Sequence, residues 1–519
     1  MSSVAVNSQC SESVPTPANG GLVAFIRPGV GTVIRFSTLA LILLGLALRC
    51  YHYGRNPSVW HDEAALILNV ICKSFGELLG PLYFAEAGPP LFLWLERVVR
   101  LWLGDGVFAL RLLPFAASCI ALLLVAFTAR RKLPAVAVPI AVLLFACSRS
   151  MLWHASEAKP YAVDVALAAL LPALSYGFMN AWRLEKRLIF FAIISPIAIA
   201  LSFPGCFLMG GVALSMLPEV WGSSRKSAWL SFALLLATTG SAFLLLLLGP
   251  IHAQRCANME SCWVHAFAPW HTPRRVPIWA LSSFLGMTRY CVDPVGGVLI
   301  LPAIFGFVGL WKRGQQALVI LLVSPIGLAF FAACLKAYPF DASRVVAFAA
   351  PALALGVAEG VTILAAWLYE RSSIAKNQLQ VWSLKLMLAG LVVVLVFPLC
   401  RAGIDVVKPW PRADVAAVAS FVLQERKKTD PVVGNHWEHA YYFRSLRDDF
   451  VFWDGRPLPD VARCWLVITA GTEGESQLLI AIAKGFTWQT VREQRFAQCH
   501  ALLLERIPAQ PVTFTPPSN

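Results

Sequence analysis

The chain has 519 residues, of which 58% are hydrophobic and only 14% are charged. Soluble domains carry roughly 25% charged and about 45–50% apolar residues, so this composition excludes an ordinary soluble protein. The net charge of +14 does not indicate nucleic-acid binding. The Lys and Arg residues form short clusters between apolar runs, not a basic stripe interleaved with aromatic residues.

The first 31 residues are polar and rich in Ser, Pro, Ala and Gly, so we expect 1–31 to be a disordered cytoplasmic tail. Long apolar runs then recur through the first 400 positions. A helix needs about 20 apolar residues to cross a hydrocarbon core of ~30 Å. The pattern predicts an all-α polytopic membrane domain over 32–400 with about eleven transmembrane helices. These are expected near 34–50, 107–128, 134–150, 160–180, 188–203, 205–220, 228–249, 295–311, 316–335, 345–368 and 383–400.

Basic clusters follow every second predicted span, which is the arrangement that the positive-inside rule requires. They leave outside the cytoplasm two long loops, 51–106 and 250–294, and the polar C-terminal region 401–519. We therefore expect a multi-pass protein of the bacterial inner membrane whose active site faces the periplasm. The apolar stretch 90–103 is short for a span and contains charged residues, so it should be an interfacial helix of the first loop. The basic clusters are Arg130, Arg131 and Lys132; Arg183, Lys186 and Arg187; Arg225 and Lys226; Lys312 and Arg313; and Arg371 and Lys376.

The C-terminal region 401–519 is predicted to be a small periplasmic α/β domain. Helices are expected over 413–427 and near 475–484, and strands at 431–433, 450–453, 465–469 and 501–504. Two cysteine pairs lie outside the predicted spans: Cys256 with Cys262, and Cys464 with Cys499. An oxidising periplasm would permit disulfides, but sequence spacing does not decide whether either pair forms one.

Residues His61, Asp62 and Glu63 lie in the first outer loop, close to the membrane surface. A carboxylate in a partly dry cleft can act as a general base, and Asp62 is the first candidate. The alternative is that Asp62 merely caps the N-terminus of a following helix. Adjacent residues of a helix do not share a face, so Asp62 and Glu63 should have different roles. One would point at substrate and the other at a structural partner or a metal.

Three cations lie at the outer ends of predicted spans, at the depth of lipid phosphates: Lys159, Lys336 and Arg344. Arginine is well shaped for bidentate phosphate contact. The alternative for all three is that they extend toward ordinary lipid headgroups. The histidines of the third outer loop do not have the spacing of a clustered zinc site. His436, Glu438 and His439 in the C-terminal region resemble metal ligands, and the two histidines could share a helix face, but a substrate-facing or packing role is the favoured interpretation.

The order of several short motifs resembles the C-type glycosyltransferase superfamily (GT-C). The closest likeness is to bacterial relatives of the protein O-mannosyltransferases and of the lipid A aminoarabinose transferase. Lys159 stands where those proteins more often have Arg. The motifs are the pair Asp62-Glu63; Glu86-Ala-Gly-Pro89-Pro90; Ala109-Leu110-Arg111; Glu157-Ala-Lys159-Pro160-Tyr161-Ala162; Tyr338-Pro339-Phe340 with Ser343-Arg344; and a Pro-Trp lead-in followed by Ala440-Tyr441-Tyr442.

The resemblance implies an inverting transfer of a sugar from a polyprenyl-phosphate donor, with undecaprenyl phosphate as the bacterial carrier, to a hydroxyl acceptor. The acceptor would be an envelope glycan, lipid A or core, or a protein. It implies Asp62 and Glu63 as the catalytic carboxylates and Lys159, Arg344 and Lys336 as the donor phosphate site. Glu86, His61, Tyr161 and Tyr338 would contact substrate or a metal, and the need for a divalent cation stays open.

Three other functions compete with the transferase. A transporter would usually contain internal repeats and broken helices at the membrane midplane, and the sequence contains no convincing repeat. A polymerase or ligase of the O-antigen kind should carry an Arg-rich outer loop in its second half. A non-catalytic protein of envelope-glycan assembly is the remaining alternative.

Overall fold

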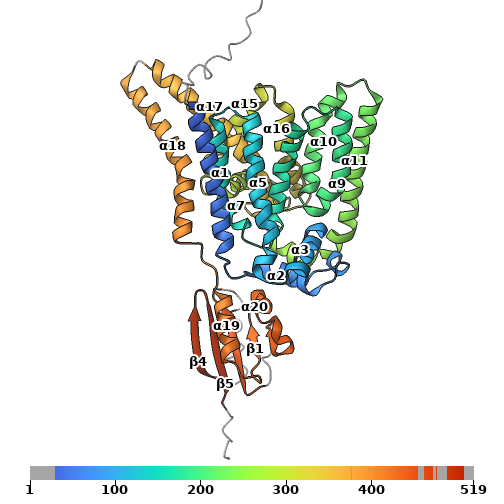
Figure 1. The fold of residues 1–519 in the computed structure, drawn as a ribbon, viewed down its shortest axis with the longest axis vertical. Coiled ribbons are helices and arrows are strands. Elements are labelled where there is room, and N and C mark those ends of the chain that lie inside the picture. Colours follow the sequence, from blue (N-terminus) through green and yellow to red (C-terminus); the bar gives the residue numbers. More distant parts are fainter. Residues whose placement is uncertain (1–29, 376, 454–460, 472–474, 476–487, 508–519) are drawn as a thin grey trace, which may run out of the picture.

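The computed structural model describes residues 30–375, 377–453, 461–471, 475 and 488–507. It consists of a large helical part and a smaller part built on a sheet (Figure 1). The predicted cytoplasmic tail 1–31 lies almost wholly outside the described residues.

Each of the eleven predicted spans coincides with a helix. Among the described residues, seven helices are long and apolar enough to cross a membrane: 31–54, 107–132, 161–178, 226–254, 316–334, 344–374 and 378–407. The chain is therefore a multi-pass membrane protein. The count of eleven is not confirmed, because α6, α10 and α15 are shorter and α9 begins with charged residues. The helices are α1 (Val30–Gly54), α5 (Leu112–Lys132), α6 (Ala137–Ala146), α8 (Tyr161–Ala173), α9 (Leu184–Leu201), α10 (Gly205–Trp221), α11 (Lys226–Leu246), α15 (Ile300–Lys312), α16 (Gln316–Cys334), α17 (Ala350–Ile374) and α18 (Gln378–Val407).

Helix α17 is enclosed by its neighbours and forms the centre of the helical core. Glycines permit its contact with α15: a Cβ atom on Gly360 would lie only 1.7 Å from the carbonyl oxygen of Pro302. Small residues allow such close approach between membrane helices. Helix α18 stands at the edge of the bundle (Figure 1) and exposes almost all of its apolar surface, as a lipid-facing helix should.

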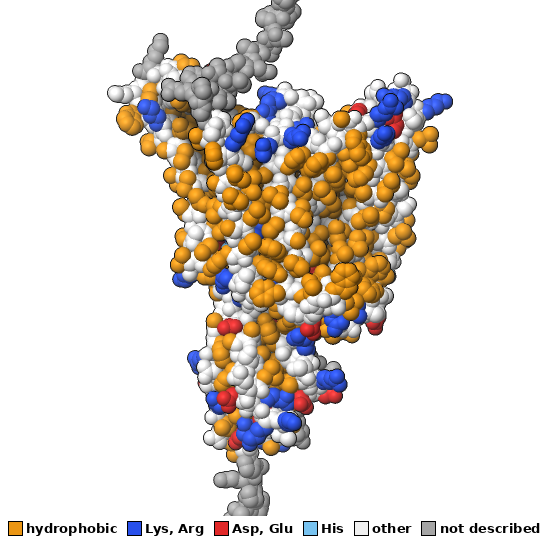
Figure 2. All heavy atoms as spheres, viewed as in Figure 1, with side chains coloured by type: hydrophobic (Ala, Val, Ile, Leu, Met, Phe, Trp, Pro, Cys, Tyr) orange, Lys and Arg blue, Asp and Glu red, His pale blue; other side chains and the backbone are white. Residues whose placement is uncertain are grey.

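Figure 2 shows Lys and Arg side chains gathered along the end of the helical part that lies away from the sheet part. This is the distribution that the alternating basic loops predict. The opposite end carries the short helices α2 (His61–Cys72) and α3 (Pro90–Leu103) (Figure 1). Two further short helices are α4 (Val107–Leu110) and α7 (Arg149–His154).

The predicted interfacial helix is α3, which buries Phe92 and Leu93 and exposes Trp102. The stretch 250–294, expected to be a loop, is largely helical. It contains α12 (His252–Gln254), α13 (Ala257–Cys262) and α14 (Val276–Cys291). Helix α14 was not anticipated because it is short and has Arg289 in its last turn, so it lacks the signature of a span.

The sheet part has the strand order β2-β1-β3-β5-β4, with β1 parallel to β2 and β3, and β5 antiparallel to β3 and β4. Helix α19 packs its apolar side on the sheet. The predicted helix 413–427 and four predicted strands are confirmed to within a few residues. Strand β4 was missed because it is a polar edge strand, and the predicted helix 475–484 lies almost wholly outside the described residues. The elements are α19 (Val415–Glu425), α20 (Trp437–Tyr442), β1 (Val432–Gly434), β2 (Phe450–Phe452), β3 (Arg463–Thr469), β4 (Trp488–Phe496) and β5 (Cys499–Arg506).

Neither candidate disulfide is formed, since all four cysteines are free thiols. Cys464 lies opposite Leu504, whereas Cys499 lies opposite Thr469, at the other end of the same strand pair. Five residues of strand span roughly 17 Å, far beyond the reach of a disulfide. The two thiols also belong to apolar clusters on different faces of the sheet.

Candidate functional site

The centre of the candidate site is an ion pair between Asp62 and Arg344. Asp62 lies in the first turn of α2, and Arg344 begins the 3-10 segment Arg344–Ala349 that leads into α17. Trp60 occupies the N-cap position of α2. The capping alternative for Asp62 is therefore not supported, because its carboxylate faces a cation from a distant part of the chain.

Aromatic rings surround the Arg344 guanidinium, whose central carbon lies 5.6 Å from the ring centre of Trp60 and 5.8 Å from those of Tyr161 and Trp263. Such cation–π contacts fix the plane of the guanidinium. Its Nε atom finds no acceptor among the described residues. Arg344 pairs with one carboxylate and keeps further N–H donors, so it can still bind an anion.

The second cation of the site is Lys159, which is buried and forms an ion pair with Glu86. Burial alone would lower the Lys159 pKa, but the carboxylates of Glu86 and Asp62 outweigh it and raise the pKa. Lys159 is therefore charged at neutral pH, close to the Asp62–Arg344 pair.

Glu63 is fully buried and turns away from Asp62. It accepts two hydrogen bonds of 2.6 Å from Arg111 and one of 2.8 Å from the backbone N–H of Ala158, and Arg412 lies 3.6 Å away. The expectation that the two adjacent carboxylates differ in role agrees with this geometry. It favours a structural role for Glu63 over the predicted catalytic one, because no oxygen is left for a substrate.

His61 joins the site to the sheet part. Its Nε2 atom lies 3.6 Å from Asp62 Oδ1, and its ring packs edge-on against His436 with centroids 4.8 Å apart. Burial lowers the His61 pKa, although the Asp62 carboxylate opposes this shift. The sheet part is held close by the hydroxyl of Tyr442, which accepts a 2.9 Å hydrogen bond from the backbone N–H of Val59.

Sequence reasoning missed a buried carboxylate network behind the site. Glu157 accepts hydrogen bonds from the indole N–H groups of Trp60, at 3.2 Å, and Trp153, at 2.9 Å, and it pairs with His154. His154 Nε2 lies 2.7 Å from the hydroxyl of Tyr290. The one available signal was the position of Glu157 two residues before Lys159. No pattern in the sequence indicates which aromatic rings contact Glu157.

The remaining predicted site residues divide into two groups. The ring of Tyr161 contacts Arg344. Tyr338 instead donates a 2.8 Å hydrogen bond to the backbone oxygen of Val345, so it shapes the segment that carries Arg344. Lys336 is exposed, and no contact among the described residues brings it to the Asp62 pair.

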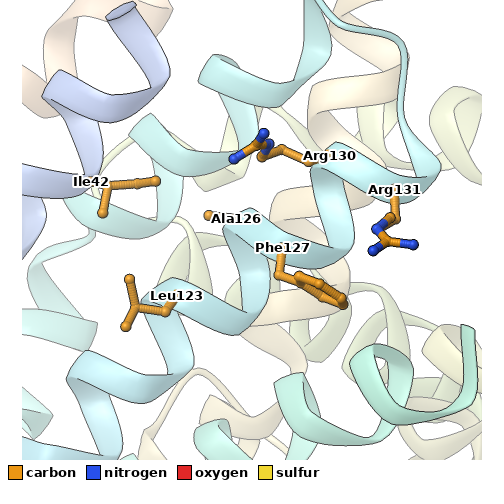
Figure 3. Close-up of a pocket in the computed structure, with 6 residues that line it drawn as sticks. All are labelled: Ile42, Leu123, Ala126, Phe127, Arg130 and Arg131. Carbon is orange, nitrogen blue, oxygen red and sulfur yellow. The ribbon is translucent and has the colours of Figure 1, made fainter. Parts of the chain in front are cut away.

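The described part of the chain contains no group of three or more His, Cys, Asp or Glu side chains placed to hold a metal ion. Glu86 is engaged by Lys159. A hollow of about 440 Å³ lies elsewhere, between α1 and the last turns of α5, with Arg130 and Arg131 beside an apolar wall (Figure 3). Arg111 precedes the first residue of α5, whereas the hollow lies at the other end of this helix. The hollow is therefore not part of the candidate site.

No protein-family model matches the sequence, and no curated protein matches it. Several solved structures do match this chain. The crystal structure of ArnT from Cupriavidus metallidurans in the apo state covers 92% of this chain, and the match covers 98% of ArnT, with 14% identity and a TM-score of 0.51. The structure of the same protein bound to undecaprenyl phosphate has the same coverage, 13% identity and a TM-score of 0.50. ArnT is a membrane glycosyltransferase of the GT-C superfamily, and the present chain therefore has the GT-C fold.

Proposed function

We propose that this protein is an inverting glycosyltransferase that moves a sugar from a polyprenyl-phosphate donor to a hydroxyl acceptor. The reaction would take place on the face of the membrane that carries the sheet part, which is the periplasmic face if the basic end is cytoplasmic. The observation that carries the proposal is the pairing of the Asp62 carboxylate with Arg344, next to the charged and buried Lys159.

In this proposal Asp62 is the general base. The acceptor hydroxyl attacks the anomeric carbon of the donor sugar, its proton passes to Asp62, and the bond from that carbon to the phosphate oxygen breaks. The lipid phosphate leaves with the electron pair. Positioned carboxylates serve as such bases, and charge that develops on a leaving group is stabilised by cations fixed in advance.

Arg344 and Lys159 are the proposed phosphate ligands. Without donor, Arg344 neutralises Asp62. A donor phosphate offers Arg344 a stronger, bidentate partner. Its arrival would weaken the hold of Arg344 on Asp62 and leave the carboxylate able to accept a proton. Base activation would then depend on donor binding, which limits unproductive reaction in the absence of donor.

The polyprenyl carrier is proposed from the fold and from the membrane setting. The ArnT structure that shares this fold was solved with undecaprenyl phosphate. The lipid-facing helices of the present chain would lie beside such a carrier. The range of candidate acceptors is the same as that given by the sequence: an envelope glycan, lipid A or core, or a protein.

The test uses the full chain in lipid nanodiscs. Wild type, Asp62→Asn and the matched control Asp105→Asn are offered a panel of polyprenyl-phosphate sugars with extracted envelope acceptors. Asp105 is half-exposed on the same loop. Release of polyprenyl phosphate is followed by mass spectrometry. We expect wild type and the control to turn over one donor, and Asp62→Asn to lose roughly a hundredfold or more of the rate.

Two results would contradict the proposal. If Asp62→Asn matches an active wild type, Asp62 is not the base. If wild type releases no lipid phosphate from any donor, the transferase proposal fails and the transporter or assembly alternative takes its place.

A further inference from the structure

A second cavity lies next to the candidate site, behind a layer of aromatic rings. Its volume is about 570 Å³, and its walls include Trp153 and Tyr290. On the other side of the layer, Trp60 and Tyr161 contact Arg344 at 5.6 and 5.8 Å. The rings of Trp60 and Trp153 have centroids 5.9 Å apart. The cavity is therefore a neighbour of the Asp62–Arg344 pair, but it has its own walls.

The cavity has a surplus of positive charge. Arg149, Arg289 and Asp293 line it. Arg149 Nε lies 3.3 Å from Asp405, and the same carboxylate is 3.2 Å from Arg401. The Asp405 carboxylate thus pairs with two arginines. The cluster consists of three arginines and two aspartates and carries a net charge of +1: Arg149, Arg289, Arg401, Asp293 and Asp405. Burial also raises the Asp293 pKa, although Arg149 opposes this shift, and a higher pKa reduces its repulsion of an anion.

Arg289 offers hydrogen-bond donors that the described part of the chain does not use. Its guanidinium is exposed, lines the cavity and makes no ion pair or hydrogen bond there. Arg149 lies on the same wall, and its contact with Asp405 through Nε leaves further N–H donors. The oxygen atoms of an anionic ligand would accept from these donors.

We propose that this cavity binds an anionic group of the acceptor, a phosphate or a carboxylate carried by a hydroxylated molecule such as a sugar, while the donor phosphate occupies the separate site at Arg344 and Lys159. Arg149 and Arg289 would hold the anion, beside the ring of Trp410. The rings of Trp153 and Tyr290 would pack against the apolar face of the sugar. This inference rests on the proposed function in calling the ligand an acceptor, but the cavity as an anion site is independent of it.

The test measures binding by equilibrium dialysis to the full chain in nanodiscs of phosphatidylcholine, which adds no net headgroup charge. The probes are radiolabelled glucose 6-phosphate, glucuronate and uncharged glucose. We expect at least one anionic probe to bind wild type more tightly than glucose. Arg289→Gln should weaken that binding by about tenfold or more, as the loss of a charged hydrogen bond predicts. Arg289→Lys, which keeps the charge, should recover part of it.

Two matched variants locate the site. Arg275→Gln removes another exposed arginine of the same outer region and should leave binding unchanged. Arg344→Gln removes the donor phosphate site, the other place where an anionic probe can bind, and the binding that depends on Arg289 should persist in this variant. The inference is overturned if neither anion binds better than glucose, or if binding depends on Arg344 and not on Arg289. If binding depends on Arg289 but wild type transfers no sugar, the anion site stands and the proposed function fails.

Discussion

Arg111 donates two hydrogen bonds of 2.6 Å to Glu63, and neither side chain is exposed to solvent. Arg111 also donates to Asn56 Oδ1, at 3.1 Å, and to the backbone oxygen of Pro57, at 2.8 Å. The pair thus fixes the chain on both sides of the candidate base, Asp62. A precise site needs such rigid support, because a misplacement of 1 Å can cost about a hundredfold in rate.

Glu63→Gln should destabilise the protein strongly. It leaves the Arg111 charge buried without its counter-charge, and breaking a buried pair in this way typically costs about 3–5 kcal/mol. The free energy of unfolding, measured by denaturant titration in detergent, tests this. The exposed pair of Arg492 and Glu425 supplies the control, since Glu425→Gln should cost less than about 1 kcal/mol. Equal stability of the two variants would show that Glu63 is not the structural anchor.

Arg344→Lys should weaken donor binding although it keeps the positive charge. Lysine cannot reproduce the planar fork of the guanidinium or its packing on Trp60 and Tyr161. We expect the KM for the polyprenyl-phosphate donor to rise about tenfold. Lys336→Ala is the control: Lys336 is exposed and should not affect the donor KM. If Lys336→Ala raises the donor KM and Arg344→Lys does not, the phosphate site lies at Lys336, which the resemblance to GT-C proteins also implied as a phosphate ligand.

The sequence predicted the parts of the site that have a local signature. The spans follow from hydropathy, and Asp62, Lys159 and Arg344 were found through the motif order that resembles GT-C proteins. Adjacent helical positions also indicated that Asp62 and Glu63 would differ. The network of Glu157 could not be predicted, because its partners come from two segments and meet only in the fold. For the same reason Lys336 and Arg344 were not distinguished, although only Arg344 contacts the site.

Glu96 should make the protein less stable as the pH rises. It is buried in α3 with neither oxygen hydrogen-bonded to a described residue. Burial and the charge of Glu63 raise its pKa well above the usual range. Below the unfolded pKa of about 4.3 both states hold the proton, and above it only the folded state does. The stability present at low pH is then lost as the pH rises toward the folded pKa.

The measurement compares wild type with Glu96→Gln, which is neutral at every pH. The two should be close in stability near pH 4.5, and the variant should become the more stable one by pH 8. A difference that stays constant over this range would show that Glu96 is not held in its protonated form.

His439, in the sheet part, should give the opposite pH dependence. It is fully buried beside Thr469, with its Nε2 atom 3.2 Å from the Thr469 hydroxyl. Burial lowers its pKa to about 4, although the carboxylate of Glu438 opposes the shift. A histidine in the unfolded state titrates near pH 6.5. Between about pH 6.5 and 4 the unfolded state therefore binds a proton that the folded state does not bind. Stability should fall across this window by a few kcal/mol and level off below it.

His439→Asn removes this titration, so its stability should not fall between pH 6.5 and 4 as that of wild type does. Denaturant unfolding of the full chain, followed by mass-spectrometric labelling of the buried thiols of Cys464 and Cys499, reports on the sheet part in particular. Glu438 acts in a different window. Burial alone would raise its pKa, but the His436 hydrogen bond and the neighbouring histidines outweigh burial and lower the pKa to about 2. Its stabilising effect is therefore lost only as the pH falls below about 4.3. A variant that kept the wild-type loss between pH 6.5 and 4 would assign that loss to another group. His61 would be the first candidate, because burial lowers its pKa as well and its ring contacts His436 in the same part of the molecule.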